Sequence, residues 1–393
     1  MIVLDIMHIL LIVYLGASVF FLIFFAIMGN VPYTVKKPLT DKMNRFVVFI
    51  PGYKEDAVIY NVAKEVLKQE YPKELYDVIV IADSFQQKTL DNLRTLPITV
   101  NEVSFEKSTK AKALNRTMEE LPDNLYDVAL IMDADNVLAP DFISRMNDSI
   151  NAGYQVVQGH RAAKNSNGFA FLDAVSEEIN NNIYSKGHRA VGMSSRLAGS
   201  GMAFSYSLYK DTMKTIDSVA EDKEVELRLL KEGYTFEYRD DAICYDEKVS
   251  QAQVFNNQRS RWISAQFHYF RKDFFQAFWH LITKGNINYF DKAFQMILPP
   301  RLLLPGFLFA AAVIAYVLSP DFYFYVWASL FAANIVSFAI SIPRKFYSRQ
   351  MFTSFLQLPK AFFGIFMTLF KLRGATKKFI HTPHTTDVSE NIN

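Results

Sequence analysis

The sequence has little cysteine and almost no excess of positive or negative charge. Cys244 is the single cysteine, which excludes an internal disulfide framework and any zinc site built on cysteine thiolates. The formal net charge is +2, and no basic run with interleaved aromatic residues occurs in the middle of the chain, so nothing indicates nucleic-acid binding. Half of the 393 residues are hydrophobic, and the apolar excess lies at the two ends. The composition predicts a soluble central part between membrane-associated ends.

Residues 6–28 form an uncharged apolar stretch that is long enough to cross a hydrocarbon core of about 30 Å as a helix. No small-residue cleavage site is present, so we do not expect a cleaved signal peptide. Lys36, Lys37, Lys42 and Arg45 follow the stretch. Positive charge after a span predicts that the N-terminus lies outside and the next segment lies in the cytoplasm, as in an integral protein of a plasma or inner membrane.

The C-terminal part is also expected to associate with a membrane. Residues 274–282 suit a helix lying flat at the surface. Residues 295–318, interrupted by prolines, and 322–342 are candidate spans, and the loop 319–321 between them lacks Lys and Arg, which predicts that it lies outside. Residues 355–372 have basic residues on both sides and favour an interfacial or re-entrant helix over a third crossing. We therefore divide the chain into an anchor (1–30), a cytosolic domain (31–272) and a membrane-associated part (273–393).

Short apolar runs in the central part end at acidic or turn residues. Residues 46–50 lead to Glu55, residues 78–82 lead to Asp83, and the third run, within 126–135, ends at Asp133. Such runs predict buried parallel strands of an α/β sheet, whose carboxyl ends form the ligand-binding edge. Three strands should therefore deliver these carboxylates to one edge of the sheet.

Asp133 and Asp135 stand two residues apart, so their side chains can face one target on extended chain. Two neighbouring carboxylates repel each other unless a cation neutralises them, and Mg²⁺ or Mn²⁺ bound by carboxylates and substrate phosphates is a common arrangement. We interpret the pair as the metal site for a nucleotide diphosphate. The alternative is a pair of solvated turn residues.

Other candidates follow the same reasoning, each with a structural alternative. Lys110 opens a helical stretch and either reaches a donor phosphate or lies on a solvated helix face. The turn Gly199, Ser200, Gly201 either lets the backbone approach a ligand or is simply a tight turn. Asp222, after Glu221, is either a helix N-cap or a general base for an acceptor hydroxyl.

Gln258, Arg261 and Trp262 are spaced i, i+3 and i+4, so they share one face of a helix. A guanidinium group binds diphosphate oxygens in a forked geometry, and an indole ring stacks on a sugar. The alternative is a surface cation beside a core tryptophan.

The order of these motifs resembles the membrane-bound glycosyltransferase family 2 enzymes, the group that contains cellulose and hyaluronan synthases. The resemblance covers about 46–262. Ala220 stands where members often have Thr, and Pro-Gly-Tyr-Lys-Glu stands where Pro-x-Tyr-Asn-Glu is commoner. The resemblance implies a GT-A type, Rossmann-like nucleotide-sugar domain at 31–272. It also implies roles: Glu55 and Asp83 at the nucleoside, Lys110 at the donor, Asp133 and Asp135 at the ribose and the metal, Gly199–Gly201 as the acceptor floor, Asp222 as the base, and Arg261 with Trp262 at the diphosphate and the sugar entry.

The resemblance further implies inverting transfer from a nucleotide diphosphate sugar, with uridine favoured. The acceptor would be a growing β-linked glycan or a membrane-lipid-linked acceptor that receives single sugars. Three or four membrane segments are few for walling a polysaccharide channel unless the protein forms homo-oligomers. A nonenzymatic membrane protein that senses a nucleotide is the alternative from another class.

Overall fold

The computed structural model describes residues 2–164, 169–248, 252–318, 322–356 and 358–369. Within them the chain folds into one eight-stranded mixed sheet with the order β3-β2-β1-β4-β7-β6-β8-β5. The first four strands in this order are parallel, β7 runs antiparallel to both β4 and β6, and β8 is parallel to β6. The α/β class is as expected. The strands are β1 (Phe46–Tyr53), β2 (Tyr76–Asp83), β3 (Thr99–Val103), β4 (Val128–Ile131), β5 (Val137–Leu138), β6 (Val156–Ala163), β7 (Met202–Ser205) and β8 (Phe236–Asp246).

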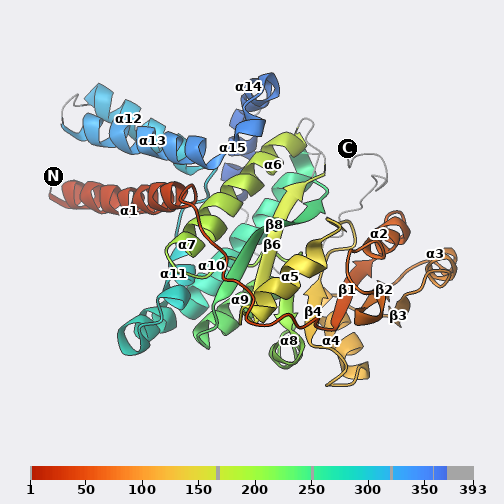
Figure 1. Ribbon diagram of the computed structural model, residues 1–393. Helices are drawn as coiled ribbons and strands as arrows, with labels where there is room; N and C mark the ends of the chain where they lie inside the picture. The colour runs from red at the N-terminus through yellow and green to blue at the C-terminus, as the bar shows by residue number, and fades with distance from the viewer. Residues whose placement is uncertain (1, 165–168, 249–251, 319–321, 357, 370–393) are drawn as a thin grey trace.

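Helices cover both faces of the sheet, and further helices at the two ends of the chain lie beside it (Figure 1). In the α/β part they are α2 (Ile59–Val66), α3 (Gln87–Leu93), α4 (Lys110–Glu120), α5 (Phe142–Asn151), α6 (Phe169–Asn180), α7 (His188–Ala190), α8 (Tyr206–Met213) and α9 (Glu221–Lys231), with a π-helix (Asn181–Gly187) between α6 and α7. The remaining helices are α1 (Ile2–Met28), α10 (Ala252–Lys284), α11 (Ile287–Gln295), α12 (Leu304–Leu318), α13 (Phe322–Ser341), α14 (Arg349–Phe355) and α15 (Leu358–Leu369).

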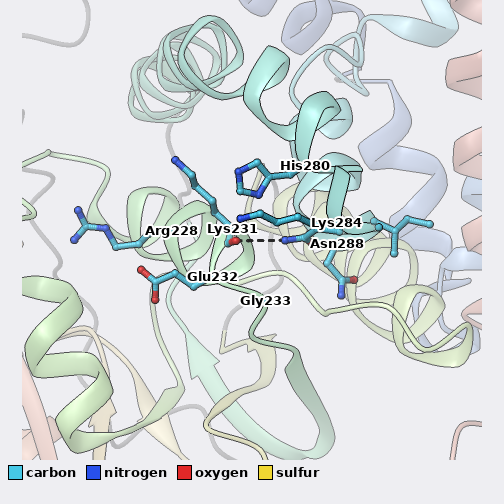
Figure 2. Close-up of a pocket in the computed structure, with 10 residues that line it drawn as sticks. Arg228, Lys231, Glu232, Gly233, His280, Lys284 and Asn288 are labelled. Atoms are coloured by element: carbon cyan, nitrogen blue, oxygen red, sulfur yellow. Dashed lines mark hydrogen bonds between the residues drawn. The ribbon is translucent and has the colours of Figure 1, made fainter. Parts of the chain in front are cut away.

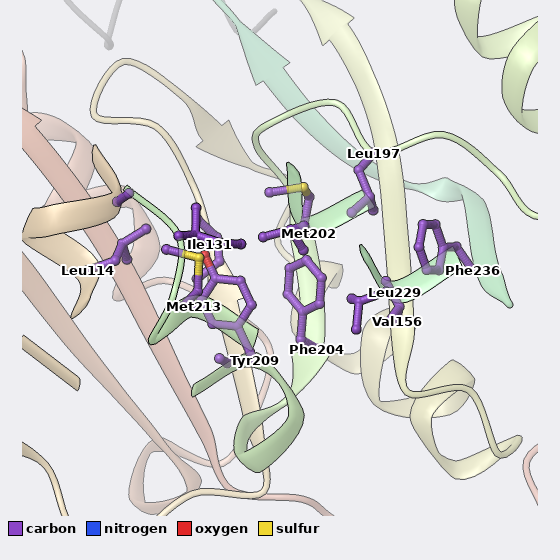
Figure 3. Close-up of a cluster of buried hydrophobic side chains, with 14 of the residues drawn as sticks. Leu114, Ile131, Val156, Leu197, Met202, Phe204, Tyr209, Met213, Leu229 and Phe236 are labelled. Carbon is purple, nitrogen blue, oxygen red and sulfur yellow. The ribbon is translucent and has the colours of Figure 1, made fainter. Parts of the chain in front are cut away.

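The central strands are apolar on both faces because each face packs against helices. In β1, Val47 and Phe49 belong to one core, while Phe46, Val48 and Ile50 belong to the other. This alternation follows from the two-residue period of a strand, and it explains the continuous apolar runs of the sequence. The first core includes side chains of α4, α8 and α9, and Figure 3 shows part of it.

The helices α1, α12 and α13 lie side by side and project from the α/β part (Figure 1). They pack through an apolar cluster that includes Leu15 and Val19 of α1, Leu308 of α12 and Trp327 of α13. Among the described helices, residues 5–28 and 322–341 are long and apolar enough to cross a membrane.

The expected span at 295–318 is shorter in the structure. Pro299, Pro300 and the residues around them separate α11 from α12, so α12 begins at Leu304 and has only 15 residues. The expected surface helix 274–282 is the end of the 33-residue helix α10, on which Phe275 and Trp279 are exposed. Residues 319–321 and the end of 355–372 lie outside the described residues.

Candidate active site

The loop after β4 places its carboxylates at the carboxyl edge of the sheet. The backbone N–H of Asp133 donates to Ser200 Oγ at 3.0 Å, and Asn136 Nδ2 donates to the same oxygen at 2.8 Å. Ser200 is fully buried and therefore joins the β4 loop to the glycine turn before β7. Asp135 is also buried, and Lys164 Nζ donates to its carbonyl oxygen.

Lys110 brings several predicted site residues together. It is the first residue of α4, whose N-cap is Thr109. Its Nζ lies 2.5 Å from Asp133 Oδ1, 2.7 Å from the carbonyl oxygen of Gly199 and 3.6 Å from Glu221 Oε1. Burial alone would lower the pKa of Lys110, but the attraction of Asp133 and Glu221 raises it above its usual value. The lysine is therefore a charged member of the cluster, and the solvated-face alternative is wrong.

Glu221 and Asp222 start helix α9, where carboxylates interact favourably with the helix dipole. Burial raises the pKa of Glu221 to about 7 against the opposing effect of Lys110, and repulsion from Asp222 and Asp133 adds to the rise. Ala220 is the N-cap, so the N-cap alternative for Asp222 is wrong. Asp222 Oδ1 instead accepts from the backbone N–H of Lys223 at 2.8 Å.

The glycines of the turn 199–201 are required by the backbone. Both have positive φ, +83° at Gly199 and +64° at Gly201, which L side chains rarely adopt. A Cβ on Gly199 would lie 3.4 Å from Asp222 Oδ2, and a Cβ on Gly201 would lie 2.9 Å from Cys244 Cβ. The turn therefore approaches Asp222 closely with backbone atoms alone.

Glu55 follows strand β1 by two residues, and Asp83 is the last residue of the neighbouring strand β2. Tyr53 and Asp83 are paired in the sheet, and the backbone N–H of Lys54 donates to the carbonyl oxygen of Asp83 at 3.1 Å. Both carboxylate residues are buried. The structure thus places them along the same edge as Asp133, because β2, β1 and β4 are adjacent.

The helix α10 carries Gln258, Arg261 and Trp262, and the Arg261 side chain lies outside the described residues. Trp262 is 47% exposed, which rules out the core alternative for it. Its ring lies 4.4 Å from the guanidinium carbon of Arg259, which forms an ion pair with Asp173 of α6 at 2.5 Å. Among the described contacts, Trp262 is joined to this pair and not to the Lys110 cluster.

The sequence interpretation missed Arg259 and Asp173. No local signal identifies them, because the two residues are 86 positions apart. A second arginine two positions before Arg261 was the only available hint.

The residues around Asp133 fit a divalent metal. Asp133, Glu221 and Asp222 gather around Lys110, and repulsion from Asp222 and Asp133 adds to the rise that burial causes in the pKa of Glu221. The described residues hold no group of three or more His, Cys, Asp or Glu side chains arranged for a metal. Asp133 and Asp135 would therefore need oxygens from substrate phosphates to complete the coordination, which suits Mg²⁺ or Mn²⁺.

An open hollow elsewhere on the domain does not contain any predicted site residue (Figure 2). It lies between the end of α9 and the turn joining α10 to α11, where Asn286 Nδ2 donates to the carbonyl oxygen of Leu230 at 2.8 Å. Its lining includes Arg228, Lys231, His280 and Lys284.

The mixed sheet, with acidic side chains at its carboxyl edge, is a nucleotide-sugar domain of GT-A type. Residues 44–265, more than half of the chain, match the family model described as "Glycosyltransferase like family 2". The chain therefore belongs to this family, and the protein is a glycosyltransferase. Comparison with curated protein sequences gives no significant match.

Three solved structures illustrate what the chain is similar to. The mannosyltransferase PcManGT from Pyrobaculum calidifontis, in complex with GDP-Man and Mn²⁺, is 16% identical with a TM-score of 0.51, covering 84% of this chain and 95% of that one. TarS 1–349 from S. aureus with UDP-GlcNAc is 14% identical with a TM-score of 0.40, covering 86% and 93%. Glucosyl-3-phosphoglycerate synthase from Mycobacterium tuberculosis, with Mn²⁺, UDP and phosphoglyceric acid, is 14% identical with a TM-score of 0.39, covering 56% and 76%. Only the first likeness supports the shared fold.

Proposed function

We propose that the protein transfers a sugar, with inversion, from a nucleotide diphosphate sugar to an acceptor hydroxyl at the membrane surface. The observation that carries the proposal is the convergence of Lys110 with Asp133, Gly199 and Glu221, residues from four separate segments. A lysine in a purely structural ion pair needs only one carboxylate partner. A site that binds a diphosphate and a metal needs several charged side chains, because their partners change when the ligand binds.

The donor side consists of Glu55 and Asp83 for the nucleoside, Lys110 for the diphosphate and Asp133 with Asp135 for the metal. A bound Mg²⁺ or Mn²⁺ would supply positive charge next to the leaving diphosphate. Asp133 and Asp135 would hold this ion, and Lys110 would pair with phosphate oxygens of the donor. In the resemblance to family 2, Arg261 adds a second cation there, while Gln258 and Trp262 border the sugar.

The acceptor side consists of Asp222 above the turn 199–201. The hydroxyl oxygen attacks the anomeric carbon from the face opposite the diphosphate, its proton passes to Asp222, and the diphosphate leaves with the electrons of the broken C–O bond. Asp222 suits this role because one carboxylate oxygen is held by the backbone of Lys223 and the other lies towards Gly199. An α-linked donor would give a β-linked product.

We favour a lipid-linked acceptor over a growing polysaccharide. A processive synthase needs a polar path for its product, whereas α1, α12 and α13 pack against one another through apolar side chains. That packing suits an anchor that keeps the domain at the bilayer surface. Product length on a sizing gel separates the two acceptors.

The test is turnover of a panel of UDP- and GDP-linked sugars by membranes containing the full chain, with Mn²⁺, with Mg²⁺ and with a chelator. GDP donors belong in the panel because PcManGT is described with GDP-Man. We expect metal-dependent release of the nucleotide from one donor. Asp222→Asn should abolish release while keeping nucleotide affinity, and the exposed Asp217→Asn should behave as wild type. Nucleotide binding without turnover by the wild type would instead support the nonenzymatic sensor.

A further inference from the structure

A second charged cluster lies between the sheet and the membrane helices, and none of its members was predicted as a site residue. Its carboxylates are Asp173 and Glu177 of α6 and Asp246 of β8. The cations paired with them come from β6, the segment before the glycine turn, the residues just after β8, and α10. Another cation precedes α12. The cations are Arg161, Arg196, Lys248, Arg259 and Arg301.

The cations of this cluster outnumber its carboxylates. Arg196 pairs with Glu177 at 2.5 Å and Lys248 with Asp246 at 2.7 Å. Within the described part of the chain, the partners of Arg301 are neutral: Ser176 Oγ at 2.9 Å and the Ser176 carbonyl oxygen at 3.1 Å. Five cations against three carboxylates leave a formal excess of two positive charges. Enclosing such an excess is unfavourable unless an anion compensates it.

Two neighbouring carboxylates of the described residues do not supply that anion. Glu226, on α9, is already shared by Lys223 at 3.0 Å and Lys292 at 2.7 Å. Glu178, the next carboxylate on α6, pairs with His160 at 3.4 Å and with Lys345 at 3.3 Å. Each of these neighbouring carboxylates therefore has its own cations.

Several guanidinium N–H groups of the cluster have no acceptor. Among the described residues, Arg161 Nε, Arg196 Nε and Arg301 Nη1 are buried without a hydrogen-bond partner. Native proteins leave few buried donors unsatisfied, because each one forfeits its bonds to water. Burial also lowers the pKa of Arg301 to about 10, and the nearby Arg259 and Arg196 add to that effect against Tyr184. An anion entering the cluster would relieve both the missing bonds and the repulsion.

The cluster remains reachable and has a definite position. The side chains of Arg161 and Arg196 keep 15% and 14% of their surface exposed. Arg161 Nη1 donates to the carbonyl oxygen of Ala198 at 2.6 Å, directly before the glycine turn of the acceptor side. On the opposite side, Arg301 precedes Leu304, which belongs to the apolar cluster of α1, α6 and α12. The charges thus lie where the transfer site meets the membrane helices.

We propose that this cluster binds the phosphate of a lipid acceptor, holding the headgroup beside the turn 199–201 while the lipid chain follows the apolar helices. The proposal rests on the proposed transferase function and names the acceptor class for it. Arginine suits the role because its planar fork binds phosphate oxygens in pairs. The excess positive charge favours binding of an anion. The apolar cluster of α1, α6 and α12 next to it favours an anion that is attached to a hydrocarbon chain.

The experiment measures binding of farnesyl phosphate to the full chain in a neutral detergent, with farnesol and inorganic phosphate as comparison probes and UDP as the probe of the donor side. We expect wild type to bind farnesyl phosphate at least about tenfold more tightly than either comparison probe. Arg196→Gln and Arg301→Gln should each weaken farnesyl phosphate binding by about tenfold or more, since each removes a charged donor pair. Unchanged UDP affinity in the same samples shows that the variants are folded.

Two further variants make the result specific. Arg349→Gln, an exposed arginine of α14 on the membrane side, should leave farnesyl phosphate binding unchanged, which controls for general attraction to anions. Glu177→Gln removes one compensating carboxylate and should tighten binding. If either arginine variant fails to fold, its lysine counterpart keeps the charge, loses the fork and should show a smaller loss.

Three results would overturn the proposal. Equal affinity for inorganic phosphate and farnesyl phosphate would show that the cluster does not recognise a lipid chain. If the arginine variants lost affinity for UDP and kept affinity for farnesyl phosphate, the cluster would belong to the donor site. Unchanged farnesyl phosphate binding in both arginine variants would show that the cluster does not bind anions. Failure of the transferase function is a separate result, since it appears as absent sugar turnover while lipid phosphate still binds.

Discussion

Replacing Glu221 by Gln should change how the stability of the protein depends on pH. Glu221 is buried, and its pKa is raised to about 7 from the usual 4.5. Burial is the largest cause, and it outweighs the stabilising effect of Lys110. The glutamine keeps the shape of the side chain but has no charge to lose or gain, so it isolates this one titration.

The sign follows from proton binding. Between pH 4.5 and 7 the folded state holds the proton of Glu221 more tightly than the unfolded state does, so unfolding releases protons and stability falls as pH rises. A shift from 4.5 to about 7 corresponds to about 3 kcal/mol, lost across this interval and absent at any higher pH. Glu221→Gln should therefore be less sensitive to pH than wild type by about that amount.

The assay is urea unfolding of the detergent-solubilised protein, followed by tryptophan fluorescence at pH 5, 6, 7 and 8. The free energy of unfolding of wild type should fall relative to that of Glu221→Gln as pH rises from 5 to 7. Above pH 7 the difference between the two proteins should stay constant. The exposed Glu232→Gln on the same helix is the matched control and should run parallel to wild type. A Glu221→Gln curve parallel to wild type would refute the assignment of the raised pKa.

Three other outcomes follow from the geometry. Lys110→Gln should lower sugar turnover by roughly 100-fold, since it removes the cation that we propose pairs with the leaving diphosphate, and the rate of nucleotide release measures this. Burial would lower the pKa of His160, but hydrogen bonds to two carboxylates raise it to about 9; wild type should lose stability from pH 6.5 to 9, and His160→Gln should lack that loss in the same unfolding assay. Gly201→Ala should cost more stability than Gly153→Ala, because both have positive φ, worth about 1 kcal/mol, but only Gly201 would also press its Cβ against Cys244. If the two alanine substitutions lowered the free energy of unfolding equally, the side chain of Cys244 would be able to move aside without cost.

The strands that were easiest to predict are those buried on both faces. The runs at 46–50 and 78–82 are apolar at every position because helices pack on each side, and they became β1 and β2. The run after Tyr126 became β4. By contrast, β7 has only four residues and directly follows the glycine turn, so its pattern is too short to separate from a loop.

Local pattern also limited the prediction of the site. The carboxylates at strand ends were visible because a strand end is a local feature. The partners of Lys110 were not, because its contacts with Asp133 and Gly199 span 23 and 89 positions. Lys110 was therefore equally compatible with a solvated helix face, and only the folded arrangement distinguishes the two. The same reason hid the cationic cluster, whose members pair across α6, β6, β8 and α10.

The segment 196–201 connects the two charged regions. Lys110 binds the carbonyl oxygen of Gly199 from the donor side, and Arg161 binds the carbonyl oxygen of the preceding residue, Ala198, from the membrane side. Glu226 fixes the start of the segment by accepting from the backbone N–H of Leu197 at 2.8 Å. Lys110 and Arg161 hold consecutive peptide groups from the two charged regions. A change of charge in either region therefore acts on the same short stretch of backbone. The glycine turn is thus positioned by both sides together, and an anion bound at the cationic cluster would draw Arg161 away from the backbone that lies next to Asp222.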